Sequence, residues 1–318
     1  MSEAAAIGEI ITVRGAVPVA DVGITLPHEH LYIQLWEIRG RFDGAHQLED
    51  DVVFCSELDA FRKLGGTCLV DLTLPAIGRQ PDRLRRLAIT TGVHIVMGCG
   101  WYREPYYPPE DRIDRRDVAA LAEILVNEIR VGFGPEHIQP GVIGEIGVDK
   151  NYISAAEERV HRAAARAQRE TGLSIATHGL FSDVGLRQLN LLEEAGADPR
   201  RIAIGHCDSY PHLDYLRSIA ERGAYVMLDN IGDQFGEHEA RVARLVAELI
   251  DAGHLEKILL SHDVCKMPQL RYHGGRGFTY LFEHFVPRLS SLGVCEEAIR
   301  TITSDNPRRW LSHVRTPS

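Results

Sequence analysis

The stretch TLPHEHLYI, Thr25 to Ile33, places two histidines one residue apart at the end of an apolar run. In an extended strand, residues i and i+2 share a face, so His28 and His30 would project to the same side with their Cα atoms about 7 Å apart. One metal ion can span that spacing. The alternative is a polar strand end with two solvated histidines, and the rest of the chain has to decide between these two interpretations.

Short apolar segments rich in β-branched residues alternate with longer segments of helical period, such as 155–172 and 240–254, along most of the chain. Because the strand-like segments are apolar nearly throughout, they favour a parallel sheet covered by helices. The predicted strands are 23–28, 67–73, 94–100, 141–147, 173–179, 201–208, 224–230 and 257–263.

The rhythm of these units predicts an α/β fold, a (β/α)8 TIM barrel formed by residues 1–318 as a single domain. A doubly wound open sheet is the rival fold, but its first strand-to-helix turn usually carries a glycine-rich GxGxxG loop, and here that turn carries the histidine pair. Residues 1–20 are predicted to form a short β-hairpin before the barrel, and residues 290–313 a closing helical segment.

Composition excludes several classes of function. The 318 residues are 44% hydrophobic and 25% charged with a formal net charge of −10, which argues against a nonspecific nucleic-acid binder. We find neither a secretory signal nor an apolar run of about 18 residues, so no membrane span is predicted. The six cysteines are far apart with no CxxC pair, which indicates reduced thiols and a cytoplasmic location.

Residues that ligate metals recur at the ends of five predicted strands, and these ends would meet at one mouth of a barrel. A single strand-end histidine is usually a packing accident, but five such ends favour one common site. Six protein ligands are too many for one catalytic ion, which keeps a position open for water, and are enough for two. The predicted ligands are His28, His30, Glu145, His178, His206 and Asp263.

The cofactor predicted from this set is a pair of divalent metal ions. Imidazole and carboxylate together suit Zn, Mn, Co or Fe, and we expect Zn. Glu145 is the central carboxylate and is predicted to bridge ions about 3.5 to 4 Å apart, with a hydroxide as the second bridge.

From about Gly23 to Trp310, the chain resembles the phosphotriesterase-like family of the amidohydrolase superfamily. The resemblance rests on PHEHL, GEIG, ATHG, IGHCD, LSHD, the GG of YHGGRGFTYL and the terminal NPRRWL. The name-giving enzymes carry a carboxylated lysine where this chain has Glu145, and a glutamate there resembles the phosphotriesterase homology branch. The resemblance implies a more buried ion on His28, His30 and Asp263, a more exposed ion on His178 and His206, and Glu145 as the bridge.

The resemblance also implies a metal-dependent hydrolase of a lactone or other carboxylic ester, with Asp263 taking the proton of the bridging water. The alternatives are a phosphotriester or phosphoester hydrolase and, as an outside case, a non-catalytic binding protein on the same barrel. We expect a small-molecule substrate, no nucleic-acid or membrane partner, and a homodimer.

Candidate substrate-binding residues lie in the loops after the strands, because the barrel frame is constant and those loops vary. Trp101 and Tyr102 belong to the aromatic loop after strand three, where plain surface packing is the alternative. Asn230 stands where the family's phosphotriesterases carry a histidine and its lactonases an arginine. Lys266 and Arg271 lie in the long loop after strand eight and are either solvated or bound to an anionic substrate group.

Overall fold

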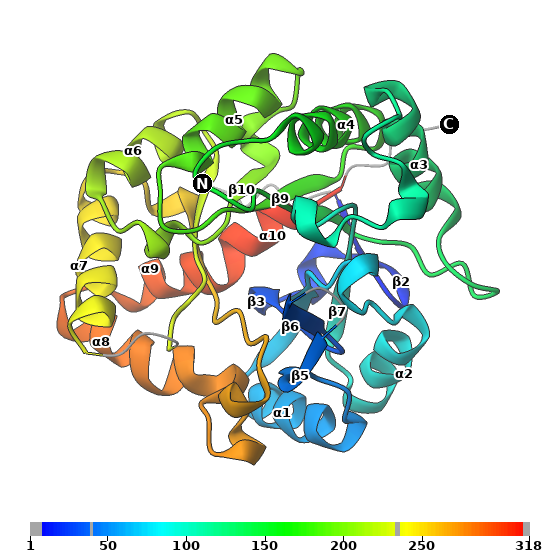
Figure 1. Cartoon of the computed structure of the whole chain (residues 1–318). Helices are drawn as coiled ribbons and strands as arrows, with labels where there is room; N and C mark the ends of the chain where they lie inside the picture. The colour runs from blue at the N-terminus through cyan, green and yellow to red at the C-terminus, as the bar shows by residue number, and fades with distance from the viewer. Residues whose placement is uncertain (1–7, 39–40, 233–235, 314–318) are drawn as a thin grey trace.

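The computed structural model describes residues 8–38, 41–232 and 236–313. Eight parallel strands form one sheet in the order β12-β11-β10-β9-β8-β7-β6-β3, curled almost into a closed barrel (Figure 1). All eight predicted strands are confirmed. They are β3 (Ile24–Glu29), β6 (Gly66–Asp71), β7 (His94–Cys99), β8 (Val142–Gly147), β9 (Ser174–His178), β10 (Ile202–Ile204), β11 (Tyr225–Leu228) and β12 (Ile258–Leu260).

Several strands end earlier than predicted. β10 stops two residues before His206, and β12 stops three residues before Asp263. Both residues have positive φ, 55° for His206 and 52° for Asp263, and this left-handed backbone cannot continue a strand. The two side chains therefore leave the ends of their strands in sharp turns.

Helices form an outer ring around the sheet (Figure 1). The longest, α4, begins with a capping box between Ser154 and Glu157 and ends at Gly172, whose φ of 76° suits a residue without Cβ. The α-helices are α1 (Asp51–Lys63), α2 (Pro81–Thr91), α3 (Val118–Val131), α4 (Ala155–Thr171), α5 (Val184–Glu194), α6 (Leu213–Glu221), α7 (Glu237–Asp251), α8 (Val286–Ser291), α9 (Glu296–Arg300) and α10 (Asn306–Leu311).

The predicted N-terminal hairpin is confirmed as β1 (Glu9–Thr12) paired with β2 (Gly15–Pro18), and residues 1–7 of the predicted segment lie outside the described residues. Glu9 exchanges two backbone hydrogen bonds with His313, so the hairpin is joined to the end of the described chain. Ile10 of β1 and Trp310 of α10, both fully buried, pack in one cluster with alternate side chains of the barrel strands. These two elements therefore close the barrel interior at the end opposite the strand-end histidines.

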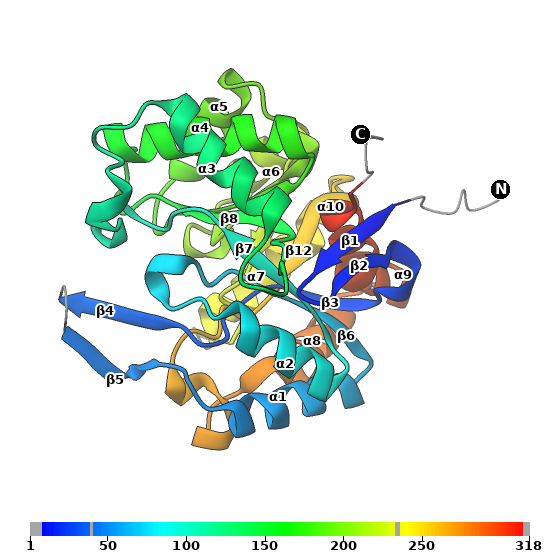
Figure 2. The ribbon, with the colours of Figure 1, turned by 90° about the vertical axis from the view of Figure 1, so that its right-hand side faces the viewer.

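A second hairpin, β4 (Gln34–Ile38) with β5 (Arg41–Gln47), was not predicted from the sequence. It follows β3 directly and projects away from the barrel (Figure 2). Trp36 stacks on Tyr106 with ring centroids 4.2 Å apart, and the Tyr106 hydroxyl donates to the Trp36 carbonyl over 2.5 Å. This contact joins the hairpin to the aromatic loop after β7.

All six cysteines are free thiols, and Cys68, Cys99 and Cys207 are buried. None of the helices in the described part of the chain is both long enough and apolar enough to cross a bilayer.

Candidate metal centre

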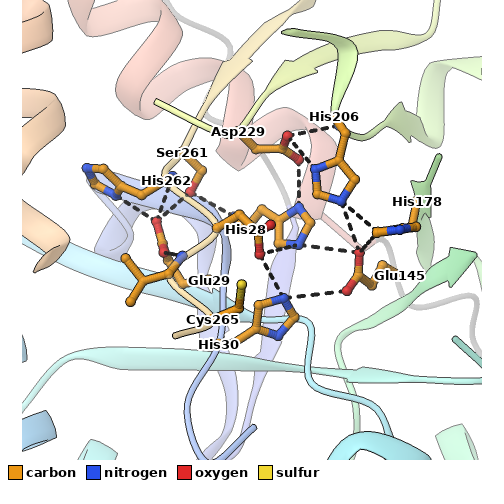
Figure 3. Close-up of polar contacts among 12 residues, drawn as sticks. His28, Glu29, His30, Glu145, His178, His206, Asp229, Ser261, His262 and Cys265 are labelled. Atoms are coloured by element: carbon orange, nitrogen blue, oxygen red, sulfur yellow. Dashed lines mark hydrogen bonds and ion pairs between the residues drawn. The ribbon is translucent and has the colours of Figure 1, made fainter. Parts of the chain in front are cut away.

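The six predicted ligands lie together at the carboxyl ends of the barrel strands. Figure 3 labels five of them, all except Asp263. His28 and His30 come from the end of β3, Glu145 from β8 and His178 from the end of β9. His206 and Asp263 come from the turns after β10 and β12. All six side chains are buried except Asp263, whose side chain is 16% exposed.

Their ligating atoms form two neighbouring groups. In one, His28, His30 and Asp263 place their atoms within 4.8 Å of one another, and in the other Glu145, His178 and His206 do the same. This division matches the one that the family resemblance implied for two ions.

Glu145 connects the two groups. Its Oε1 lies 3.4 Å from Nε2 of His30, and its Oε2 lies 2.9 Å from Nδ1 of His178 and 3.5 Å from Nε2 of both His28 and His206. A carboxylate with one oxygen toward each group has the arrangement that a bridging ligand needs.

Asp229, just after β11, orients two of the histidines from behind. Its Oδ2 accepts from Nδ1 of His28 over 2.6 Å, and its Oδ1 accepts from Nδ1 and from the backbone N–H of His206, each over 2.9 Å. The two histidines therefore turn Nε2 toward Glu145. Asp229 also forms a close group with these histidines, but its oxygens are occupied by Nδ1–H donors, so we assign it to orientation rather than to ligation.

Asp229 is not among the site residues predicted from the sequence. Thr73 is not among them either, and its Oγ1 lies 3.1 Å from Nδ1 of His30 and orients that histidine in the same way. The available signal was position alone, because Thr73 is the last residue of the predicted strand 67–73 and Asp229 the last but one of the predicted strand 224–230.

Opposed electrostatic effects act on the buried groups. Burial disfavours the charged form of His28, but Asp229 and Glu145 outweigh it and raise the pKa of His28 to about 9. Burial lowers the pKa of His178 to about 4, although Glu145 acts in the opposite direction. Burial would raise the pKa of Glu145, yet the charges of His178 and His28 hold it well below its usual range. The cluster is thus anionic at its centre and favours positive charge.

These residues fit a divalent metal ion. Nε2 of His28 is buried without a hydrogen-bond partner, and an unpaired buried polar atom costs about 1 to 3 kcal/mol. The nitrogen faces Glu145 and Asp263, at 3.5 and 3.6 Å, so a cation between them would pair all three groups. Imidazole with carboxylate is the donor set of Zn, Mn, Co and Fe sites.

Of the predicted substrate residues, Tyr102 lies beside the cluster. Its buried ring meets the His178 ring edge-on, with centroids 4.8 Å apart. Trp101 is also buried, and its Nε1–H donates to Asp111 over 2.6 Å within the same loop. The loop after β7 therefore packs against the predicted metal ligands through Tyr102.

Asn230 has a defined orientation. Its backbone N–H and its side-chain Nδ2 donate to the two oxygens of the buried Asp208, over 2.8 and 2.9 Å. Because a carboxylate only accepts, the amide nitrogen must face Asp208 and the Oδ1 must face away from it.

The two predicted basic residues both lie in the loop after β12. Lys266 is exposed, and the guanidinium of Arg271 donates to Thr279 over 2.5 Å and pairs with Glu283 at 3.1 Å. Their role in binding an anion stays a prediction. Arg276 lines a cavity of about 170 Å³ together with Ile231 and Val264, which follow Asn230 and Asp263 in the chain.

A parallel eight-stranded barrel that gathers imidazoles and carboxylates at its carboxyl-terminal mouth is typical of hydrolases that use metal ions. Comparison with known proteins agrees: the chain belongs to the phosphotriesterase family, whose model matches residues 8–311. It is a hydrolase of that family.

Relatives within the family carry different names. The chain is 34% identical to the phosphotriesterase homology protein of Escherichia coli, over 91% of this chain and 97% of that protein. It is 30% identical to the aryldialkylphosphatase of Saccharolobus solfataricus (94% and 98% covered) and 27% identical to the N-acetyltaurine hydrolase of Danio rerio (96% and 98%). The solved structure of a resiniferatoxin-binding protein from Rhodobacter sphaeroides superposes with a TM-score of 0.88 at 33% identity, covering 96% of this chain and 95% of that one.

Proposed function

We propose that the protein is a binuclear metal-dependent hydrolase that cleaves a lactone or another carboxylic ester. One observation carries the proposal: Glu145 connects two groups of potential metal-ligating atoms, and the Tyr102 ring packs against His178 at their edge. The expected ions are zinc, with Mn, Co or Fe as alternatives. When bound, such a pair supplies Lewis acidity and lowers the pKa of a shared water.

Asp263 is the proposed proton acceptor. Its Oδ1 lies 3.0 Å from Nε2 of His30, so it borders the centre, and its side chain is 16% exposed where that of Glu145 is 1% exposed. A carboxylate that touches both the centre and the open mouth can take a proton from water and release it to a leaving group.

Tyr102 is the proposed hydrogen-bond donor to the substrate oxygen. Burial raises the pKa of its hydroxyl well above the ordinary value, and the charge of Glu145 adds to this effect. The phenol therefore keeps its proton at neutral pH. A preorganised donor of this kind stabilises the negative charge that develops on a carbonyl oxygen under attack.

A second candidate substrate is an N-acyl amide, and the orientation of Asn230 favours it. Because Asp208 holds the amide nitrogen, Asn230 offers its Oδ1 as an acceptor. The N–H of a secondary amide can donate to this oxygen, whereas the ring oxygen of a lactone cannot. A relative named N-acetyltaurine hydrolase cleaves a bond of that type, as its name states.

The decisive experiment is a substrate panel with metal-reconstituted protein: lactones, simple esters, an ester and an amide of the same acyl group, and an aryl phosphotriester. Turnover of a lactone or ester with kcat/KM of about 10⁴ M⁻¹s⁻¹ or higher supports the proposal. A preference for the phosphotriester would instead indicate a phosphotriester hydrolase. A preference for the amide would favour the second candidate substrate. Binding without any turnover would indicate a non-catalytic binding protein.

We further propose that the protein acts in the cytoplasm, on a small molecule, as a homodimer. Sedimentation equilibrium of the metal-loaded protein tests the dimer, and a single species of 35.5 kDa would exclude it.

A further inference from the structure

β12 and β3 are the first and last strands in the hydrogen-bonded order of the sheet, and they meet at a seam that closes the barrel. The seam carries His28 on one side and Asp263 on the other. The backbone N–H of Asp263 donates to the His28 carbonyl over 3.2 Å, and the N–H of His28 donates to Ser261 Oγ over 3.0 Å. Side chains as well as backbone therefore close the barrel at this point.

Glu29 is the centre of that closure. It lies between His28 and His30 in sequence, but alternation along the strand turns it to the opposite side, away from Glu145 (Figure 3). The side chain is fully buried. Its Oε1 accepts from Ser261 Oγ, from the His262 backbone N–H and from His262 Nδ1, over 2.9, 3.0 and 2.7 Å, and its Oε2 accepts from the Val264 N–H over 2.9 Å.

These hydrogen bonds surround Asp263. The N–H groups on both sides of Asp263, from His262 and Val264, end on Glu29, while the N–H of Asp263 itself ends on β3. Asp263 has a φ of 52°, a conformation that costs free energy for a residue with Cβ and persists only where its surroundings enforce it. In this conformation its carboxylate faces His28 and His30.

His262 extends the same network outward. Its Nε2 accepts the backbone N–H of Leu281 over 2.9 Å, so its Nδ1 carries the proton and donates to Glu29. Both ring nitrogens are engaged in this way, which explains why this strand-end histidine turns away from the metal-ligand cluster (Figure 3).

We propose that Glu29 is a positioning residue that locks the turn holding Asp263 and thereby sets the affinity of the ion held by His28, His30 and Asp263. The consequence for the ion rests on the metal centre of the proposed function. The locking of the turn does not, because every contact that supports it lies within the chain.

The first test uses hydrogen exchange on the metal-free protein, with Glu29→Gln as the variant. The two oxygens of Glu29 accept from four donors, and glutamine replaces one of these oxygens with an NH₂ group that cannot accept. The amides of residues 261–265 should therefore exchange at least about tenfold faster than in the wild type. Glu57→Gln is the matched control, since Glu57 is also buried and accepts the backbone N–H groups of Arg271 and Tyr272. Both of these N–H groups end on Oε1 and Oε2 has no hydrogen-bond partner, so the glutamine can keep both bonds and exchange at 261–265 should stay unchanged.

The second test is a zinc titration against a competing chelator. Glu29→Gln should weaken the affinity for one of the two ions by about 10- to 100-fold and leave the affinity for the other unchanged. This is the usual effect when a metal ligand loses the residue that positions it. Adding Glu29→Gln to an Asp263→Ala variant should not lower the affinity for either ion any further, because the ligand that Glu29 positions is already absent. Ser261→Ala, which removes one donor to Glu29 together with the acceptor of the His28 N–H, should also weaken the binding of this ion and serves if Glu29→Gln does not fold.

The outcomes separate the two ideas. Unchanged exchange at 261–265 in Glu29→Gln, or in Ser261→Ala if that variant must serve, overturns the role of Glu29 whatever the metal content. Faster exchange with both ions held as in the wild type overturns its influence on the ion. A wild-type chain that binds no ion overturns the proposed metal centre, while hydrogen exchange still decides whether Glu29 locks the turn.

Discussion

Asp229 Oδ2 lies 2.6 Å from Nδ1 of His28, and the same carboxylate binds His206 through its other oxygen. One aspartate thus sets the ring orientation of one histidine from each of the two ligand groups. Both histidines present Nε2 to Glu145 as a result.

We expect Asp229→Asn to lower metal affinity by about 10- to 100-fold, because an amide keeps only one acceptor oxygen and one histidine loses its partner. Chelator competition measures this. Asp208→Asn is the control, since Asp208 is equally buried but bonds to Asn230. Wild-type affinity in Asp229→Asn would show that the histidines do not depend on this carboxylate.

Glu145→Ala should reduce bound metal well below two ions per chain and abolish hydrolysis, because both ligand groups lose a shared anionic ligand. Elemental analysis of the purified variant measures the metal. Two tightly held ions in this variant would rule out Glu145 as the bridge. Glu145→Lys should recover function only when bicarbonate can carboxylate the lysine.

Asp263→Asn keeps one ligand oxygen but cannot take up a proton. Metal content should therefore survive while kcat falls by about 10² or more, as is typical when an acid-base group is removed. Steady-state kinetics on protein of verified metal content tests this. Near-normal turnover by the fully loaded variant would refute the role of Asp263 as base.

Tyr102→Phe should reduce lactone or ester turnover more than any turnover of an aryl phosphotriester. A carbonyl develops a single oxyanion that the buried phenol can stabilise, and losing such a donor costs about 10²-fold or more in kcat. Tyr107→Phe, in the same loop, is the control. If Tyr102→Phe leaves lactone turnover unchanged, the phenol does not contact the reacting oxygen.

His161→Gln should make the protein less sensitive to acid. Burial lowers the pKa of His161 to about 4, and its two ring nitrogens bond to the Glu157 carbonyl and to Gln188. The neutral form is therefore the one that the fold stabilises. This stability is fully present above pH 6.5 and decreases by about 3 kcal/mol as the pH falls toward 4.

Urea unfolding of wild type and His161→Gln between pH 4 and 7.5 measures that difference. The variant should show a flatter dependence of the free energy of unfolding on pH, whereas a variant of the exposed His273 should follow the wild type. Parallel curves for wild type and His161→Gln would mean that another group controls acid sensitivity.

The sequence by itself determined the strands and the ligand types. Period and composition located all eight parallel strands because a strand buried on both faces is apolar along nearly its whole length, as in residues 95–99 of β7. Convergence of His28, Glu145 and His206 followed from topology, since the carboxyl ends of barrel strands share one mouth. Nothing in the local pattern of residues 34–47, by contrast, led us to predict the projecting hairpin.

Only the tertiary structure decided which polar residues support the predicted metal ligands and which face elsewhere. Glu29, His262 and Asp229 sit at strand ends just as the ligands do, and sequence position cannot distinguish them. Their roles depend on contacts across more than 200 residues, such as His28 with Asp229 and Glu29 with His262. A hydrogen bond is directional and short, so its partner is known only when the folded backbone has brought both groups within about 3 Å of each other.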